Sequence, residues 1–518
     1  MFRLKNKYCL IFLGLLFFII AIIRIVFYDL DHSDEFTDAN ILNAGENFIK
    51  FGFINCHFLP LHEPGLDAPQ NLYTHYPPLA DILNGLLRLI FRTNSLRFFR
   101  FVSLCFSFLG LLAWYFFIQN LTKSSLIGFL SSLFYLFNPL FIYGVDSLGI
   151  SYTEFLRALI FLLFLKVLNT ANLKRIIFFV FLWLAIVLET LFTFEYIIYL
   201  SLFFLLFKTL YPKEPDKKIS LKEIFILWLA PIVGFMLHFL QNVFYFGSFL
   251  LALQDLKGAA LQSVTQRPDA TPLNFPLWVQ NVLLRNISLV AIFNYFLIFL
   301  CIFFVSLFYK VLTLQTQKII RRLFRLGLIF LICGLSWYII FPAHSWAHTF
   351  VLFLARHLIP AVAIGFSIFI YIIFSFINEK IGSLGYLKVL WLIVIFIIFN
   401  GIIRSELPVT PTKIKQAQEF IKFKKCLLKL KEISQEKDVV AVNYYRFPFM
   451  RYYTGRRFIN IFDRASLEKL SVLPKYFILI PYDNPSTQEL FQFLNQRYST
   501  IFGCNSERFP TIFFELKQ

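Results

Sequence analysis

The sequence has 518 residues, of which 58% are hydrophobic and 15% are charged. This balance excludes an ordinary soluble globular protein, because a chain this apolar must use lipid as the solvent for most of its surface. The net charge of +19 does not predict nucleic acid as a partner, since the lysines and arginines fall mainly in short loops between apolar runs.

The apolar runs predict an α-helical polytopic membrane protein with about eleven spans. The first run is long, contains Arg24 and lacks a small-residue cleavage site, so we interpret it as a retained span and not as a signal peptide. The odd number of spans places the two termini on opposite sides. The spans are expected near residues 8–28, 98–119, 124–145, 149–168, 175–193, 195–211, 223–246, 286–309, 322–341, 349–378 and 385–404.

Basic residues in alternate loops predict the orientation of these spans. Loops on one face carry most of the lysines and arginines, which marks that face as cytoplasmic and puts the N-terminus there; examples are Lys7, Lys123, Lys174, Lys213 and Lys318. The opposite face receives residues 29–97, the turn around Asp146, residues 247–285, residues 341–348 and everything after Arg404. We therefore expect a multi-pass protein of the cell (inner) membrane with an extracytoplasmic C-terminal domain.

The segment 29–97 is too long to be a passive connection between two spans. It contains an acidic cluster and then an apolar stretch, 79–91, whose leucines and isoleucines recur at helical spacing. We interpret this stretch as an interfacial helix, with Asp81, Asn84 and Arg88 as polar positions for the lipid headgroup region.

The composition changes after Arg404, which divides the chain into a membrane domain, 1–404, and a small soluble α/β domain, 405–518. A lysine-rich helical pattern at 413–433 precedes strand-like 439–442 and 476–480, a helical pattern at 487–496 and a final strand at 511–516. The seven cysteines show no CxxC spacing, which argues against a zinc ribbon or a thioredoxin-like site. Cys426 and Cys504 could pair if this domain lies outside, and the sequence leaves that open.

Two adjacent acids, Asp34 and Glu35, follow the first span on the outer face. A carboxylate beside a membrane surface experiences a lowered dielectric and can serve as a general base. The alternative is that these acids belong to an ordinary exposed loop.

Asp34-Glu35, residues 39–45 (Ala-Asn-Ile-Leu-Asn-Ala-Gly), residues 50–53 (Lys-Phe-Gly-Phe) and residues 72–79 (Leu-Tyr-Thr-His-Tyr-Pro-Pro-Leu) together resemble the first outer loop of the GT-C glycosyltransferases. The similar branch contains protein mannosyltransferases and lipid A aminoarabinose transferases. The resemblance implies that Asp34 is the catalytic residue with Glu35 beside it. It also implies a donor in which a sugar is carried on dolichyl or undecaprenyl phosphate.

Such a donor needs cations near its phosphate. Arg100 and Arg356 lie inside apolar runs, where a charge is costly and a functional role is the default hypothesis; the alternative is an interhelical partner such as Glu154, Glu189 or Glu195. The candidates for contacting donor phosphate or substrate are His75, Arg100, Arg267, His344, His348, Arg356 and His357. His75 is included because aminoarabinose transferases have Glu-Lys before the Pro-Pro pair where this chain has His75-Tyr76.

A second acid is expected from the resemblance, and either Asp146 or Glu154 could fill that role. His344 and His348 are too few ligands for zinc, so no metal or other cofactor is predicted. Arg451, Tyr453 and Arg456 belong to a basic aromatic cluster in the tail, which fits either sugar binding or docking against the membrane domain.

The sequence thus predicts an inverting glycosyltransferase that moves a sugar from a polyprenyl-phosphate donor to a hydroxyl of a protein, lipid or glycan acceptor at the outer membrane surface. Two rivals are a transporter or lipid flippase and a noncatalytic envelope assembly factor. The chain shows no internal repeat of the kind common in transporters.

Overall fold

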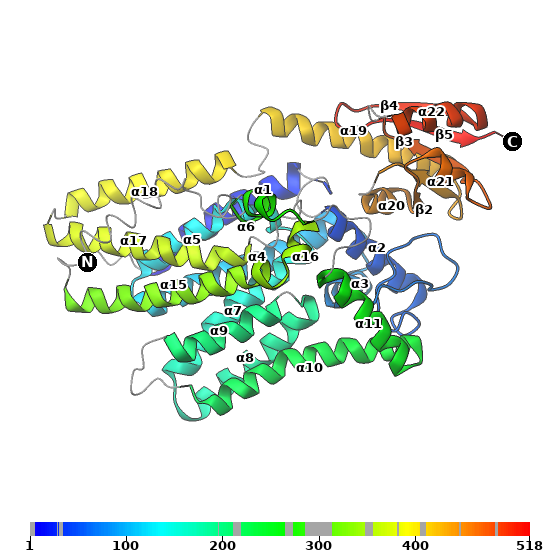
Figure 1. Ribbon diagram of the computed structural model, residues 1–518. Helices are drawn as coiled ribbons and strands as arrows, with labels where there is room; N and C mark the ends of the chain where they lie inside the picture. The colour runs from blue at the N-terminus through cyan, green and yellow to red at the C-terminus, as the bar shows by residue number, and fades with distance from the viewer. Residues whose placement is uncertain are drawn as a thin grey trace.

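The computed structural model describes residues 6–27, 29–30, 35–194, 196–210, 219–264, 273–284, 313–347, 356–380, 383–404, 411–444, 447–481 and 485–517. Most of these residues form long helices that run roughly side by side, and a small sheet lies beyond one end of the bundle (Figure 1).

The membrane bundle is built from apolar helices that closely follow the predicted spans. Six described stretches are long and apolar enough to cross a membrane: α1 (Asn6–Phe27), α4 (Leu96–Thr122), α8 (Asn172–Phe192), α10 (Leu221–Phe246), α15 (Leu314–Ile340) and Arg356–Phe376, most of which is α17 (Ile359–Lys380). The bundle is completed by α5 (Ser125–Leu136), α7 (Ile150–Asn169), α9 (Tyr196–Leu210) and α18 (Ser383–Arg404). Aromatic rings fill its core, where Phe330 packs against Phe161 and Phe203 with centroids 4.7 and 5.3 Å apart. The α-helical membrane fold is confirmed.

The expected span at 124–145 is wrong, because it consists of two helices. α5 ends at Leu136, and the short α6 (Pro139–Gly144) follows after a break at Asn138. Pro139 has no N–H and cannot continue α5, whereas it fits the first turn of a new helix. The Asn138 side chain caps that helix by accepting from the Leu140 N–H at 3.1 Å.

One other expected span, 322–341, differs clearly from the structure at its start. α15 begins at Leu314, eight residues before the predicted start at 322. The expected span at 286–309 and the first residues of the one at 349–378 lie outside the described residues.

The segment between α1 and α4, for which we keep the name first outer segment from the predicted topology, contains α2 (Glu35–Phe51) and α3 (Leu79–Phe91). The bounds of α3 match the prediction, but the expected role of its polar face is wrong. Asp81, Asn84 and Arg88 are buried in the protein, while Leu89 and Ile90 are exposed. The Arg88 guanidinium donates to the Asn84 side chain at 2.9 Å, so the polar face of α3 packs inward.

On the same side of the bundle, a second outer segment follows α10. Gly247, with φ of 62°, ends α10 and lets the chain turn into α11 (Phe249–Val264). The shorter α12 (Phe275–Trp278), its continuation Val279–Leu284 and α16 (Pro342–Ala347) complete the outer helices. The starts of α10, α15 and α18 lie at the far end of the bundle from the sheet (Figure 1).

The C-terminal domain contains a five-stranded mixed sheet and helices, which agrees with the predicted α/β class. Its strands β1 (Val439–Val442), β2 (Arg457–Asn460), β3 (Tyr476–Leu479), β4 (Tyr498–Asn505) and β5 (Pro510–Leu516) have the order β2-β1-β3-β5-β4, with β1 parallel to both neighbours and β5 antiparallel to both of its own. Its helices are α19 (Pro411–Ile433), α20 (Pro448–Thr454), α21 (Arg464–Glu468) and α22 (Pro485–Arg497). The sequence analysis did not predict β2, β4, α20 and α21.

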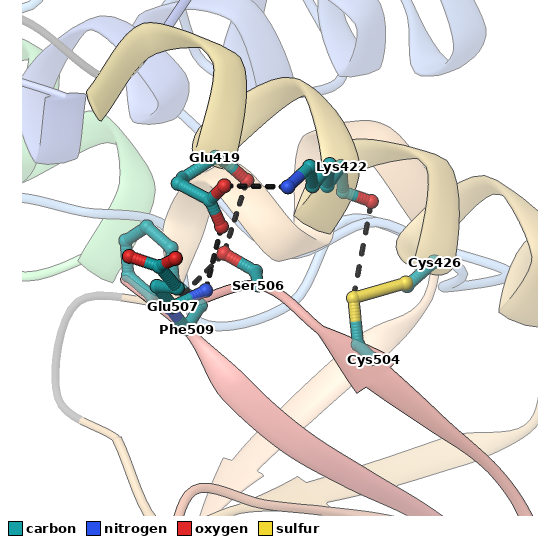
Figure 2. Close-up of a disulfide and its surroundings, with 7 residues drawn as sticks. All are labelled: Glu419, Lys422, Cys426, Cys504, Ser506, Glu507 and Phe509. Atoms are coloured by element: carbon teal, nitrogen blue, oxygen red, sulfur yellow. Dashed lines mark hydrogen bonds and ion pairs between the residues drawn. A yellow bond between two sulfur atoms is a disulfide. The ribbon is translucent and has the colours of Figure 1, made fainter. Parts of the chain in front are cut away.

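A disulfide between Cys426 and Cys504 joins α19 to β4 (Figure 2). The Glu419 carboxylate reinforces this junction by accepting from the Glu507 N–H at 2.6 Å and from Lys422 Nζ at 2.6 Å. The long helix α19 is therefore fixed to the edge of the sheet.

Candidate active site

The turn after α6 holds a buried carboxylate between two buried arginines. Asp146 Oδ1 accepts from Arg24 Nε at 3.0 Å and Nη2 at 2.6 Å, and Arg100 Nε lies 3.6 Å from Asp146 Oδ2. All three side chains are at most 2% exposed. A carboxylate buried this deeply stays charged only with such partners, so α1, α4 and the turn are held together by charge.

The first turn of α2 packs against the same turn. Asp38 Oδ1 accepts from Ser147 Oγ at 2.8 Å and from the Leu148 N–H at 2.9 Å. Glu35 begins α2 and is 7% exposed. The chain therefore brings the acidic start of α2 directly beside the Asp146 turn. Asp34, the predicted catalytic residue, lies outside the described residues.

A second buried cluster surrounds Glu154, near the outer end of α7. Its carboxylate accepts from Tyr135 Oη at 2.8 Å and from Arg157, and Arg356 Nη1 lies 3.7 Å from its other oxygen. The interhelical partner considered for Arg356 is therefore present, and it is Glu154. Arg100 also has an acidic partner, which is Asp146.

Aromatic side chains extend this second cluster. Arg157 Nη1 donates to Tyr196 Oη at 2.5 Å, and the His357 ring stacks on Tyr196 with centroids 4.5 Å apart. Glu189 lies within electrostatic range of Tyr196, so the cluster contains two carboxylates as well as two guanidiniums.

The short segment from Gly144 to Asp146 contacts both clusters, the second through Gly144 and the first through Asp146. A Cβ at Gly144 would lie 3.4 Å from Arg356 Nη1 and 2.6 Å from the Ile150 side chain, so this close approach requires glycine. Arg356 therefore lies beside the last residue of α6, two residues before Asp146.

Two of the other predicted residues are described. His75 Nε2 lies 3.2 Å from Asp255 Oδ1 of α11, and its ring is 5.7 Å from that of Tyr73. The acidic partner of His75 thus comes from α11 and belongs to neither arginine cluster. His357 belongs to the second cluster through its ring contact with Tyr196.

The remaining predicted residues cannot be placed. Arg267 and His348 lie outside the described residues, and the side chain of His344 does as well. Within the described ranges, no three His, Cys, Asp or Glu side chains are grouped so that they could hold a metal ion.

Sequence reasoning missed Arg24 and Arg157 as cluster members. Both are single arginines inside apolar runs, which is the signal that identified Arg100 and Arg356. It also missed Tyr135 and Tyr196, because nothing in their sequence context separates them from the many core tyrosines.

Both clusters have the chemistry of an anion-binding site next to acids. Guanidinium groups can share their donors between a carboxylate and a phosphate, and they hold charge in place as a leaving group becomes more negative. The acidic start of α2 lies beside the first of these clusters, because Asp38 accepts from Ser147 and Leu148.

Comparison with known proteins identifies the fold. No family model and no curated protein matches this chain. Among solved structures, the chain is similar to ArnT from Cupriavidus metallidurans bound to undecaprenyl phosphate, with a TM-score of 0.62, 10% identity and 97% of each chain covered. It also matches the Archaeoglobus fulgidus oligosaccharyltransferase in complex with zinc and sulfate, with a TM-score of 0.48, 13% identity, and 89% of this chain and 67% of that chain covered. The similarity to ArnT shows that the two chains share a fold, which agrees with the resemblance in the first outer loop.

Proposed function

We propose that this chain is a membrane glycosyltransferase that takes a sugar from a polyprenyl-phosphate donor and transfers it to an acceptor hydroxyl with inversion. The observation that carries this proposal is the end-to-end fold similarity to ArnT, whose structure was determined with bound undecaprenyl phosphate. Because one fold can host several functions, the proposal also depends on the site, where buried arginines lie beside an acidic helix start.

In the proposed reaction, Asp34 accepts the proton of the acceptor hydroxyl as its oxygen attacks the anomeric carbon of the donor. The bond from that carbon to the phosphate oxygen breaks, and the polyprenyl phosphate leaves with the electron pair. Glu35 orients Asp34 or the acceptor. Arg356 stabilises the charge on the departing phosphate, and Asp146 or Glu154 keeps the nearby guanidiniums in place.

We place this reaction on the extracytoplasmic side. The disulfide between Cys426 and Cys504 supports that side for the C-terminal domain, because such bonds persist in oxidising compartments. The basic starts of α10 and α15, at the other end of the bundle, support the cytoplasm there. The acceptor class, protein, lipid or glycan, is left open.

The test is sugar release from labelled polyprenyl-phosphate sugars by the purified protein in lipid nanodiscs. Asp34→Asn keeps the shape of the side chain and removes the base, so turnover should fall about 10²- to 10⁴-fold with donor binding intact. Glu35→Gln should reduce turnover less. Asp67→Asn is a matched control, because Asp67 is an acid of the same outer segment whose side chain is 79% exposed.

Each alternative outcome points elsewhere. If Asp34→Asn and Glu35→Gln both keep full turnover, the first outer loop is not the catalytic centre, and Asp146 and Glu154 become the residues to test. Lipid translocation without sugar release would favour a transporter or flippase. Neither activity with any donor would favour a noncatalytic assembly factor.

A further inference from the structure

The C-terminal domain contacts Asp29, a residue that is linked to the candidate active site. Lys424 Nζ of α19 lies 2.6 Å from Asp29 Oδ2, and the Tyr453 hydroxyl of α20 donates to Asp29 Oδ1. Asp29 follows α1 closely and precedes the acidic segment that leads into α2. Two side chains from the far end of the sequence therefore hold the start of the first outer segment.

Asp29 is also linked to the buried Asp146 cluster. Its backbone carbonyl accepts from the Arg100 guanidinium, and Arg100 lies 3.6 Å from Asp146. The contacts run without a gap from Lys424 and Tyr453 through Asp29 and Arg100 to Asp146. Because the Asp29 carbonyl positions Arg100, a shift of Asp29 would also shift Arg100.

The groups around Asp29 keep its carboxylate ionised. Burial by itself would raise the pKa of Asp29, but hydrogen bonds and charge from Lys424 and Tyr453, together with Arg100, hold this pKa below its ordinary value of 3.8. Tyr452 of α20, which also interacts with Asp29 electrostatically, keeps its proton, because burial raises its pKa. The carboxylate therefore stays ionised at neutral pH and keeps its bond to Lys424.

The domain side of this contact is rigid. Cys426, two residues after Lys424 on α19, is bonded to Cys504 of β4 (Figure 2). Further ion pairs fix the domain to the first outer segment, including Arg451 with Glu63 at 3.1 Å. Lys424 thus projects from a helix that is tied to the sheet and to the segment it contacts.

We propose that Lys424 and Tyr453 are positioning residues for the active site, so that the C-terminal domain is a working part of the enzyme. They act through Asp29, which precedes α2 in the chain and whose backbone carbonyl accepts from Arg100. This inference rests on the proposed function, because it assigns these residues to the same site. It predicts a loss of turnover without a loss of donor binding.

The experiment compares Lys424→Met and Tyr453→Phe with Lys422→Met. Lys422 is a matched control because it lies on the same helix and forms an ion pair at the same 2.6 Å, but with Glu419 inside its own domain. Misplacement of catalytic groups by about 1 Å can cost 10²-fold, so kcat should fall about 10- to 100-fold in both test variants, with the donor KM unchanged. Lys424→Arg, which keeps the charge, should restore most of kcat.

A second readout does not depend on turnover. Hydrogen–deuterium exchange at the first-turn amides of α2, Glu35–Asp38, should rise in Lys424→Met and Tyr453→Phe and remain at the wild-type level in Lys422→Met. Unchanged exchange in both test variants would overturn the proposal, and so would a normal kcat despite raised exchange. An inactive wild-type protein would remove the proposed function, and the exchange comparison would then decide alone whether the domain orders this segment.

Discussion

Replacing Asp146 by asparagine should destabilise the fold far more than an equivalent change at the surface. Asp146 is 1% exposed and faces Arg24, whose Nη2 is 2.6 Å away, and Arg100, 3.6 Å away. The amide preserves the shape but removes the negative charge that both buried guanidiniums face. Breaking a buried ion pair by removing one partner typically costs about 3–5 kcal/mol.

The matched surface pair is Lys50 with Glu436, which has the same 2.6 Å separation and side chains 41% and 62% exposed. Exposed pairs contribute roughly 0–1 kcal/mol, so Glu436→Gln should be nearly neutral. The difference between the two variants should therefore reach about 2 kcal/mol or more. Unfolding by denaturing detergent in mixed micelles, followed by tryptophan fluorescence, measures both on one scale.

The double variant Arg24→Met/Asp146→Asn tests whether the cause is the uncompensated charge. It should be less destabilised than the sum of the two single variants, by a coupling energy of about 0.5–3 kcal/mol. Strict additivity, or an Asp146→Asn cost no larger than that of Glu436→Gln, would refute the charge argument and leave Asp146 as an ordinary polar turn residue.

Three further predictions follow from the same geometry. Arg356→Ala should weaken polyprenyl-phosphate binding more than Arg356→Lys, because lysine keeps the charge and loses the guanidinium fork; unchanged affinity in Arg356→Ala would assign the residue to helix packing. Gly334→Ala should destabilise by about 1–3 kcal/mol in the same micelle assay, because the new Cβ would lie 2.8 Å from the His357 carbonyl, whereas Gly258→Ala meets nothing within 4 Å and should not destabilise. The pKa of Asp29 is lowered on folding, so wild type should be more stable than Asp29→Asn by a constant amount above about pH 5. This difference in stability should decline as the pH falls through the lowered pKa. A difference that grows on acidification would contradict the lowered pKa.

The sequence could predict the membrane fold because lipid imposes a one-dimensional constraint. Each span needs about 20 apolar residues, so the helices are visible as runs. The helix α3 was predicted to the residue because its apolar side chains recur at helical spacing between a Pro-Pro pair and a polar stretch. In the soluble domain, β1, β3 and β5 were predicted because apolar or β-branched residues dominate them, whereas the more polar β2 and β4 gave no such signal.

The candidate site could be predicted only in part, because its contacts join residues that are distant in the sequence. The sequence identified Arg100 and Arg356 as costly charges and Asp146 or Glu154 as the second acid, and the structure pairs Arg100 with Asp146 and Arg356 with Glu154. Nothing in a single sequence states which acid faces which arginine. The inward orientation of the polar face of α3 was missed for the same reason, because its partners come from α2 and the C-terminal domain.

The break at Asn138 and Pro139 explains how so much charge enters an apolar bundle. In an uninterrupted helix over 124–145, the backbone polar groups of this segment would bond to each other, and Asp146 would lie at the outer surface. The break instead folds the chain into α6 and a buried turn, where Ser107 Oγ donates to the Val145 carbonyl at 2.6 Å and Asp38 accepts from the turn. Irregular backbone is tolerated in a membrane protein where it is buried and its polar groups are satisfied, and such places are where function concentrates. The same proline that made the span prediction wrong therefore permits the buried turn that holds Asp146 between Arg24 and Arg100.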